Sequence, residues 1–198
     1  MKKLRSKHIE AFIYQEAKLG NHESGDAYFF HSEEDYCVFA IADGLGSGPI
    51  ARKSAEIIPA VLKEHHNESL DDILSRCNEH MFQKRGAAVA IVKIDYKRKK
   101  VQYSCVGNVR FYMLQGGEEM IYPLPVMGYL SGKPQKLKTQ EYRYLEGDLF
   151  FLHSDGVVLR DPRSLLRESP SSYQLYENVK QMIKLDDDAT FIVGSLRH

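Results

Sequence analysis

The segment from Cys37 to Pro49 constrains the fold of this chain most, because it joins a strand to a helix through a glycine-rich loop. Residues 37–42 are apolar and predict a buried strand, and Asp43 follows them directly. The loop then ends at Pro49, whose fixed φ suits the first turn of a helix. Such a loop typically binds phosphate through backbone N–H groups, and a carboxylate at its mouth would repel phosphate unless a cation lay between them. The segment therefore predicts metal-mediated phosphate chemistry.

Other aspartates stand at the ends of expected strands. Asp26 precedes one strand-like run, Asp155 follows a second, and Asp187 precedes a third. Magnesium and manganese prefer carboxylate and water oxygens, whereas zinc prefers the nitrogen of His and the sulfur of Cys. The sequence thus offers four dispersed aspartates, including Asp43, and no cluster of His or Cys beside them. This donor set favours a Mg or Mn site.

The remaining pattern predicts an α+β fold with antiparallel sheets rather than alternating βαβ units. Helical spacing predicts one helix from Pro49 with a kink or break at Pro59, a second from a Ser69 cap to about Arg85, and a third over 174–185. Apolar and alternating runs predict strands at 9–14, 27–31, 36–42, 87–95, 101–106, 110–114, 119–122, 142–145, 149–153 and 190–196.

Composition limits the class of protein. The 198 residues are 43% hydrophobic, which is enough for one sizeable core, and we expect a single domain over residues 1–198. Basic and acidic residues balance at 27 each, so no global field favours nucleic acid or an anionic membrane. The basic run at 97–100 is interpreted as a hairpin turn, and no apolar run approaches the ~20 residues of a membrane span.

The cysteines indicate the compartment. Cys37, Cys77 and Cys105 are odd in number, unevenly spaced and set among apolar neighbours, which predicts buried reduced thiols rather than a disulfide framework. The basic N-terminus has no apolar segment behind it of the kind that a signal peptide needs. We therefore expect a cytoplasmic protein.

Five motifs, in their order along the chain, resemble those of the metal-dependent protein phosphatases, the type 2C or PPM family. They are Gly25-Asp26, Ala42-Asp43-Gly44-Leu45-Gly46, Gly107-Asn108-Val109-Arg110, Ser154-Asp155-Gly156 and Asp187-Asp188-Ala189-Thr190. The resemblance covers residues 20–195. The short length, the glycine loop and the segment 122–135 are most similar to the regulator-of-sigma-B phosphatase X branch of Gram-positive bacteria.

The resemblance implies a four-layer αββα sandwich, in which helices flank two mostly antiparallel sheets. It also implies a phosphoserine or phosphothreonine protein phosphatase that hydrolyses the monoester with a water activated by two divalent cations, Mn²⁺ or Mg²⁺. Asp43 is the implied catalytic residue, because it would bridge the two cations. Asp26 and the Gly44 carbonyl would bind one cation, and Asp155 and Asp187 would bind the other.

Three departures from the family pattern indicate a slower or more substrate-dependent enzyme. Leu45 stands where some relatives have a His, so a histidine general acid is missing there. Asn108 stands where many relatives have an Asp that recruits a third metal. No Arg closely precedes the first motif, so the phosphate would be bound by Lys18, His22, Arg52 or water.

Histidines outside the motifs are interpreted as structural. His65 and His66 are expected at the solvated end of a helix rather than as a metal-binding pair. His153 is expected in the core or in support of the site rather than as a ligand.

Three functions compete at this point. The resemblance implies a feedback phosphatase that acts on phosphorylated scaffold subunits of a bacterial stress-signalling complex, with no nucleic-acid or membrane partner. The alternative is a phosphatase-like module that binds a phosphoprotein with little turnover, which Leu45 and Asn108 favour. Nucleotide binding by the glycine loop is weakest, because the dinucleotide fingerprint needs Gly where Pro49 stands, and a βαβ context is not evident.

Overall fold

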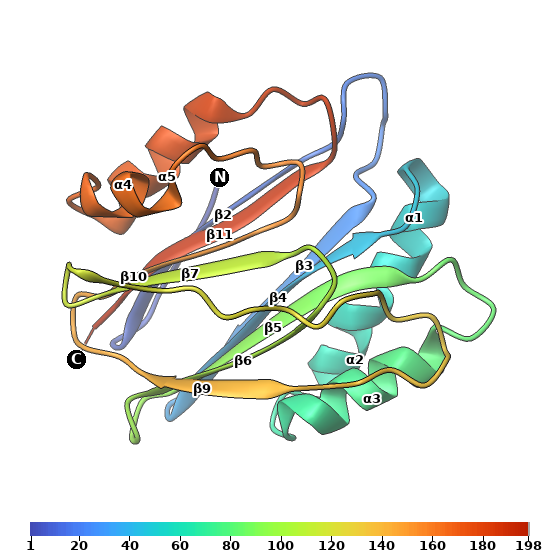
Figure 1. Cartoon of the computed structure of the whole chain (residues 1–198), viewed down its shortest axis with the longest axis horizontal. Helices are drawn as coiled ribbons and strands as arrows, with labels where there is room; N and C mark the ends of the chain where they lie inside the picture. Colours follow the sequence, from blue (N-terminus) through green and yellow to red (C-terminus); the bar gives the residue numbers. More distant parts are fainter. Residues whose placement is uncertain (198) are drawn as a thin grey trace.

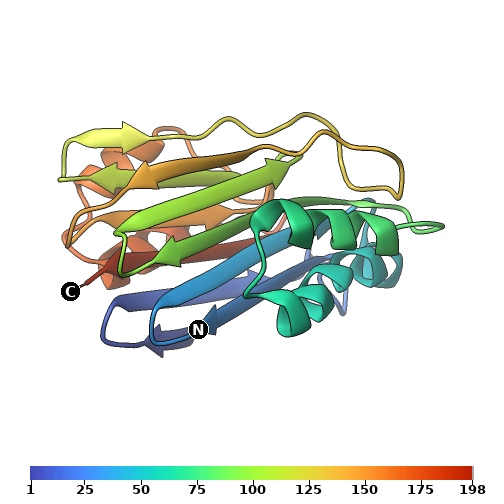
Figure 2. The ribbon, with the colours of Figure 1, turned by 90° about the horizontal axis from the view of Figure 1, so that it is seen from below.

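The chain forms two antiparallel sheets packed face to face, with helices on both outer sides (Figures 1 and 2). This computed structural model describes residues 1–197. The expected αββα sandwich is confirmed. The single domain over residues 1–198 stays a prediction, and its last residue, His198, lies outside the described residues.

One sheet has five strands in the order β3-β4-β5-β6-β9, and α1, α2 and α3 cover its outer face. The strands are β3 Asp26–Ser32, β4 Tyr36–Gly44, β5 Ala87–Asp95, β6 Lys100–Val106 and β9 Thr139–Arg143. The helices are α1 Gly48–Ala55, α2 Ile57–His65 and α3 Leu70–His80.

The other sheet has six strands in the order β1-β2-β11-β10-β7-β8, and α4 and α5 lie on its outer face. The strands are β1 Lys2–Arg5, β2 Ile9–Glu16, β11 Ala189–Leu196, β10 Leu149–His153, β7 Arg110–Gln115 and β8 Glu119–Ile121. The helices are α4 Pro162–Arg167 and α5 Ser172–Met182.

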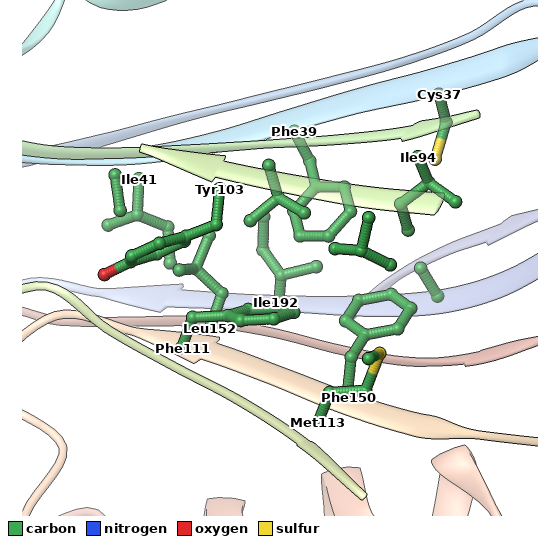
Figure 3. Close-up of a cluster of buried hydrophobic side chains, with 14 of the residues drawn as sticks. Cys37, Phe39, Ile41, Ile94, Tyr103, Phe111, Met113, Phe150, Leu152 and Ile192 are labelled. Atoms are coloured by element: carbon green, nitrogen blue, oxygen red, sulfur yellow. The ribbon is translucent and has the colours of Figure 1, made fainter. Parts of the chain in front are cut away.

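The apolar run of β4 is explained by burial on both faces. Cys37, Phe39 and Ile41 point into the core between the two sheets, where Phe39 stacks on Phe150 of the facing sheet at 5.0 Å between ring centroids (Figure 3). The intervening residues of β4 pack under the helices. A strand covered on both sides is apolar throughout rather than alternating.

The helix is not broken at Pro59, where the sequence predicts a kink or break. The interruption falls at Glu56, between α1 and α2, and Pro59 is the third residue of α2. Because N–H groups in the first turn of a helix have no intrahelical acceptor, a proline there removes no hydrogen bond. The expected start of α3 is confirmed, since the Ser69 side chain accepts a hydrogen bond from the Asp72 N–H.

Some elements differ from the pattern-based expectation. The strand expected at 142–145 spans Thr139–Arg143, and the helix expected at 174–185 spans Ser172–Met182. Neither β1 nor α4 was predicted. Both β1 and β9 are charged or polar strands at sheet edges, where backbone pairing rather than apolar alternation defines the strand.

The three cysteines are buried free thiols, which confirms the expectation made from their neighbours. None of the helices in the described part of the chain combines the length and the apolar character that crossing a bilayer requires.

Replacing Phe39 by Ala should lower the free energy of unfolding by about 3–5 kcal/mol, because it leaves a cavity between the sheets. Phe82 is 67% exposed, so Phe82→Ala is a matched control that should change stability by no more than about 0.5 kcal/mol. Urea unfolding of both variants measures the difference. Equal losses would contradict the assignment of the main core to the space between the sheets.

Candidate metal centre

The sheet of β3 and β4 contributes two facing carboxylates. Asp26 is paired directly with Asp43 in the antiparallel register of these strands. Residues directly opposite one another share one face of a sheet. Asp43 continues the side of β4 that carries Phe39 and Ile41, so both carboxylates lie where the core between the sheets ends.

The other sheet brings further polar side chains to the same edge. Asp155 lies just beyond the end of β10, and Asp187 lies just before β11, which pairs antiparallel with β10. Asn108 precedes β7, the other neighbour of β10. Its side-chain Nδ2 donates a hydrogen bond of 2.7 Å to Oδ2 of Asp155. The expected place of Asn108 beside this group of aspartates is therefore observed.

The aspartates repel one another electrostatically. Burial raises the pKa of Asp43, and the nearby carboxylates of Asp26, Asp155 and Asp187 raise it further. Burial also raises the pKa of Asp26, although a hydrogen bond from Ser154 opposes the shift. A bound divalent cation would remove this repulsion. The donor set is entirely oxygen, so it fits a hard cation such as Mg²⁺ or Mn²⁺.

A hydrogen-bond network holds Asp26 in place. The Ser154 hydroxyl donates to Asp26 Oδ2 at 2.7 Å and accepts from the Thr190 N–H at 3.1 Å. The Gln15 amide donates to the Asp26 carbonyl at 3.0 Å. None of these three residues has a role that the sequence pattern predicts. Ser154 and Thr190 lie inside the quoted motifs, and Gln15 directly follows the strand expected at 9–14.

The three consecutive aspartates have different surroundings. Asp186 and Asp187 are exposed, whereas Asp188 is buried. The Asp188 carboxylate accepts hydrogen bonds from the N–H of Gly25 at 2.8 Å and of Lys18 at 2.9 Å. Asp188 therefore ties the loop before β3 to the start of β11 and positions Asp26.

Gly44 is required by a close approach of helix α1. A Cβ atom at Gly44 would lie 2.0 Å from the carbonyl oxygen of Ala51. The backbone N–H of Gly44 donates to the Gly25 carbonyl at 3.3 Å, which joins the two loops that carry Asp26 and Asp43. The glycine-rich loop after β4 is therefore required for packing against α1, in addition to any contact with a ligand.

Arg52 is the candidate phosphate-binding residue whose charged group contacts this site. Its guanidinium donates to the carbonyl oxygen of Asp26, and its Nε lies 2.7 Å from a Glu56 oxygen. Arg52 lines two hollows, of about 530 and 320 Å³, and His22 lines the smaller one. Lys18 is exposed and contributes its backbone N–H to Asp188.

His153 lies in the core, as expected. Its ring stacks with Tyr112 and Phe151, and its Nδ1 lies 2.7 Å from the Ser154 carbonyl oxygen. Burial lowers its pKa to about 4, so the ring is neutral at physiological pH. The contact of Nδ1 joins the ring to the backbone of Ser154, the residue that holds Asp26.

Comparisons with known proteins agree with this architecture. The profile of the stage II sporulation protein E (SpoIIE) family matches residues 33–197. The phosphoserine phosphatase RsbX of Bacillus subtilis (strain 168) is 38% identical over 192 residues, which is 96% of each chain.

Two solved structures are also similar. A crystal structure of RsbX in complex with magnesium matches with a TM-score of 0.95 and 38% identity, covering 98% of each chain. A chain from a study of the bacterial stressosome, a modular system adapted to control secondary messenger signalling, matches with a TM-score of 0.85 and 32% identity, covering 94% of this chain and 98% of that chain. The chain described here therefore belongs to the SpoIIE family and has the fold of the type 2C, or PPM, protein phosphatases.

Proposed function

We propose that this protein is a metal-dependent phosphatase that hydrolyses phosphoserine or phosphothreonine in a regulatory protein. The observation that carries the proposal is the meeting of Asp26 and Asp43 with Asp155 and Asp187 at one edge of the sandwich. These aspartates come from both sheets, so the folded chain assembles an all-oxygen donor set. The 38% identity to a phosphoserine phosphatase supports the same chemistry.

The donor set suits two divalent cations. When bound, such ions acidify a water molecule toward a pKa of about 7 and neutralise the charge of a phosphate dianion. Asp43 is the proposed bridging ligand. Asp26 and the Gly44 carbonyl would complete one site, and Asp155 and Asp187 would complete the other.

The chain's own residues orient the reaction. Ser154 fixes the Asp26 carboxylate through its hydroxyl. Arg52 is proposed to position the phosphate, because its planar guanidinium can donate two parallel hydrogen bonds to phosphate oxygens. Leu45 has no titratable group, so the leaving serine oxygen would take its proton from water.

The relatives support a proposal for the substrate and the location. The relative RsbX is a phosphoserine phosphatase, and the structure with 32% identity comes from a study of the bacterial stressosome. We infer that the substrate is a phosphorylated scaffold subunit of a stress-signalling complex, reached in the cytoplasm. The three buried free thiols suit that reducing compartment.

The alternative is a binding module with little turnover. Leu45 and Asn108 favour it, but the four carboxylates proposed as metal ligands are all present at one edge. Assaying the purified protein on a phosphoserine peptide during a manganese titration separates the two. Binding of the peptide without release of phosphate at any manganese concentration would favour the alternative.

The variant Asp43→Asn should lose at least about tenfold in turnover, which is about 1.4 kcal/mol of transition-state stabilisation. It should also be more stable than wild type in chelator, because it removes one of several carboxylates that repel one another. Phosphate release and urea unfolding in chelator measure the two effects. Asp186→Asn makes the same change at an exposed position and should alter neither. Full wild-type activity after complete demetallation would contradict the proposal.

The consecutive aspartates should separate into different roles. Asp187→Ala should weaken metal binding, as should Asp155→Ala, whereas Asp186→Ala should change little. Asp188→Ala should destabilise the fold by about 1–3 kcal/mol for each of the two N–H groups that it leaves unpaired. Calorimetry with manganese and urea unfolding in chelator test these outcomes. Loss of metal affinity in Asp186→Ala alone would place the ligand one residue earlier.

The variant Asn108→Asp should tighten binding of an additional metal ion. It replaces the amide that donates to Asp155 with a like charge at the same position, so in chelator the protein should melt lower. For a chain of this size, each lost kcal/mol lowers Tm by about 2–4 °C. Millimolar manganese should restore most of the difference. Equal melting temperatures of variant and wild type throughout a manganese titration would show that position 108 lies outside the centre.

A further inference from the structure

A second group of metal-binding side chains lies at the opposite end of β3 from Asp26. It consists of His31 near the end of β3, Glu33 in the turn after it, and His66 at the C-terminal cap of α2. One potential ligand atom of each residue lies within 4.8 Å of those of the other two. At ~3.3 Å per residue, the five residues from Asp26 to His31 place this group about 17 Å from the aspartates.

His66 lies at the end of α2, as expected from the sequence, but its ring also contacts side chains of β3 and β4. Its ring is half-buried and lies 4.1 Å from the ring of His31 between centroids. Its Nδ1 lies 2.7 Å from the hydroxyl of Tyr36. Its neighbour His65 turns to a different partner, with Nδ1 2.8 Å from a Glu68 oxygen.

Strand geometry explains why these residues meet. Along β3, side chains alternate between the core and the helices, and His31 shares the helix side with Ala27 and Phe29. Helix α2 covers that side, so its last turn brings His66 above His31. The tight turn into β4, where Ser32 pairs with Cys37, brings Glu33 back toward the same ring. The oxygen Oε1 of Glu33 lies 2.6 Å from Nε2 of His31.

The donor set differs from that of the aspartate centre. Two imidazoles and one carboxylate are ligands that Zn²⁺ and similar borderline ions prefer to Mg²⁺. Tetrahedral bonds of about 2.0–2.1 Å place ligand atoms about 3.4 Å apart. The side chains of His31 and Glu33 are 36% and 49% exposed, so they can rotate to close the remaining distance.

The Tyr36 hydroxyl engages one nitrogen of His66 and leaves Nε2 for an ion. A hydrogen bond to the second ring nitrogen is how metal-binding histidines are commonly oriented. Burial, and next the proximity of His31, lowers the pKa of His66, which favours the neutral form that binds metal. The positive charge of Lys93 would repel a cation at this site. Its Nζ donates hydrogen bonds to the backbone carbonyls of Asn67 and Glu68 at 3.0 and 2.8 Å, which keep the charge in place there.

We propose that His31, Glu33 and His66 bind one Zn²⁺ or a similar borderline divalent ion, at a site separate from the aspartate centre. The ion would clamp the end of α2 to the turn between β3 and β4. Its effect is on stability, because no residue of this site lies among the proposed phosphatase ligands.

The test is a titration of the intact protein with Zn²⁺ in excess Mg²⁺, followed by calorimetry, and with Co²⁺, followed by visible absorption. Wild type and Asp43→Asn should each bind one equivalent at this site, with the intense Co²⁺ bands of a tetrahedral site. His31→Ala and His66→Ala should each weaken binding at least about tenfold, and Tyr36→Phe should weaken it by a smaller factor. Zinc should also raise the Tm of wild type but not of His66→Ala.

His65→Ala is the matched control, because it removes a histidine from the same helix end and should keep zinc affinity. Activity of His66→Ala with Mg²⁺ should equal that of wild type, and its urea unfolding in chelator would confirm that it is folded. Zinc affinities that are equal in wild type, His31→Ala and His66→Ala would overturn the proposal. Loss of binding in Asp43→Asn would also overturn it, because the zinc would then lie at the aspartates.

Discussion

Contact between the two sheets is the interaction on which the rest of the structure depends. Each sheet carries half of the aspartate centre, so the centre exists only when Phe39 and Ile41 of one sheet pack against Phe150 and Leu152 of the other. The carboxylates lie where this packing ends, with Asp26 buried, Asp43 half-buried, and Asp155 and Asp187 exposed. Burial of apolar surface thereby holds groups together that repel one another.

That repulsion gives the centre its chemistry. Burial and neighbouring carboxylates raise the pKa of Asp43, so the metal-free site carries a standing electrostatic cost. The surrounding hydrogen bonds keep the site in place despite this cost, because Ser154 fixes Asp26 and Asp188 fixes the loop before β3. A divalent cation offsets the cost, which couples metal binding to the stability of the fold.

The two ends of β3 carry different chemistry on opposite sides of the same sheet. Asp26 shares the core side of the strand and meets oxygen donors, whereas His31 lies on the helix side and meets His66 of α2. Pleating alone produces this separation, since successive side chains point to opposite faces. The oxygen donors proposed for a hard cation and the imidazole proposed for a borderline cation therefore lie at opposite ends of one strand.

The sequence by itself determined the elements whose signal is local. Apolar runs predicted the buried strands, and the Ser69 cap predicted the start of α3. Five motifs in order identified the family and predicted which aspartates bind metal. The sequence did not reveal the edge strand β1, and it misplaced the start of the edge strand β9, because both are polar strands that backbone pairing to a neighbouring strand defines. Only the tertiary structure gave Asp188 its role in holding the loop before β3, and only it separated Arg52 from Lys18 and His66 from His65. Adjacent or similar residues have the same local signal, and burial and contacts between distant segments decide which of them acts.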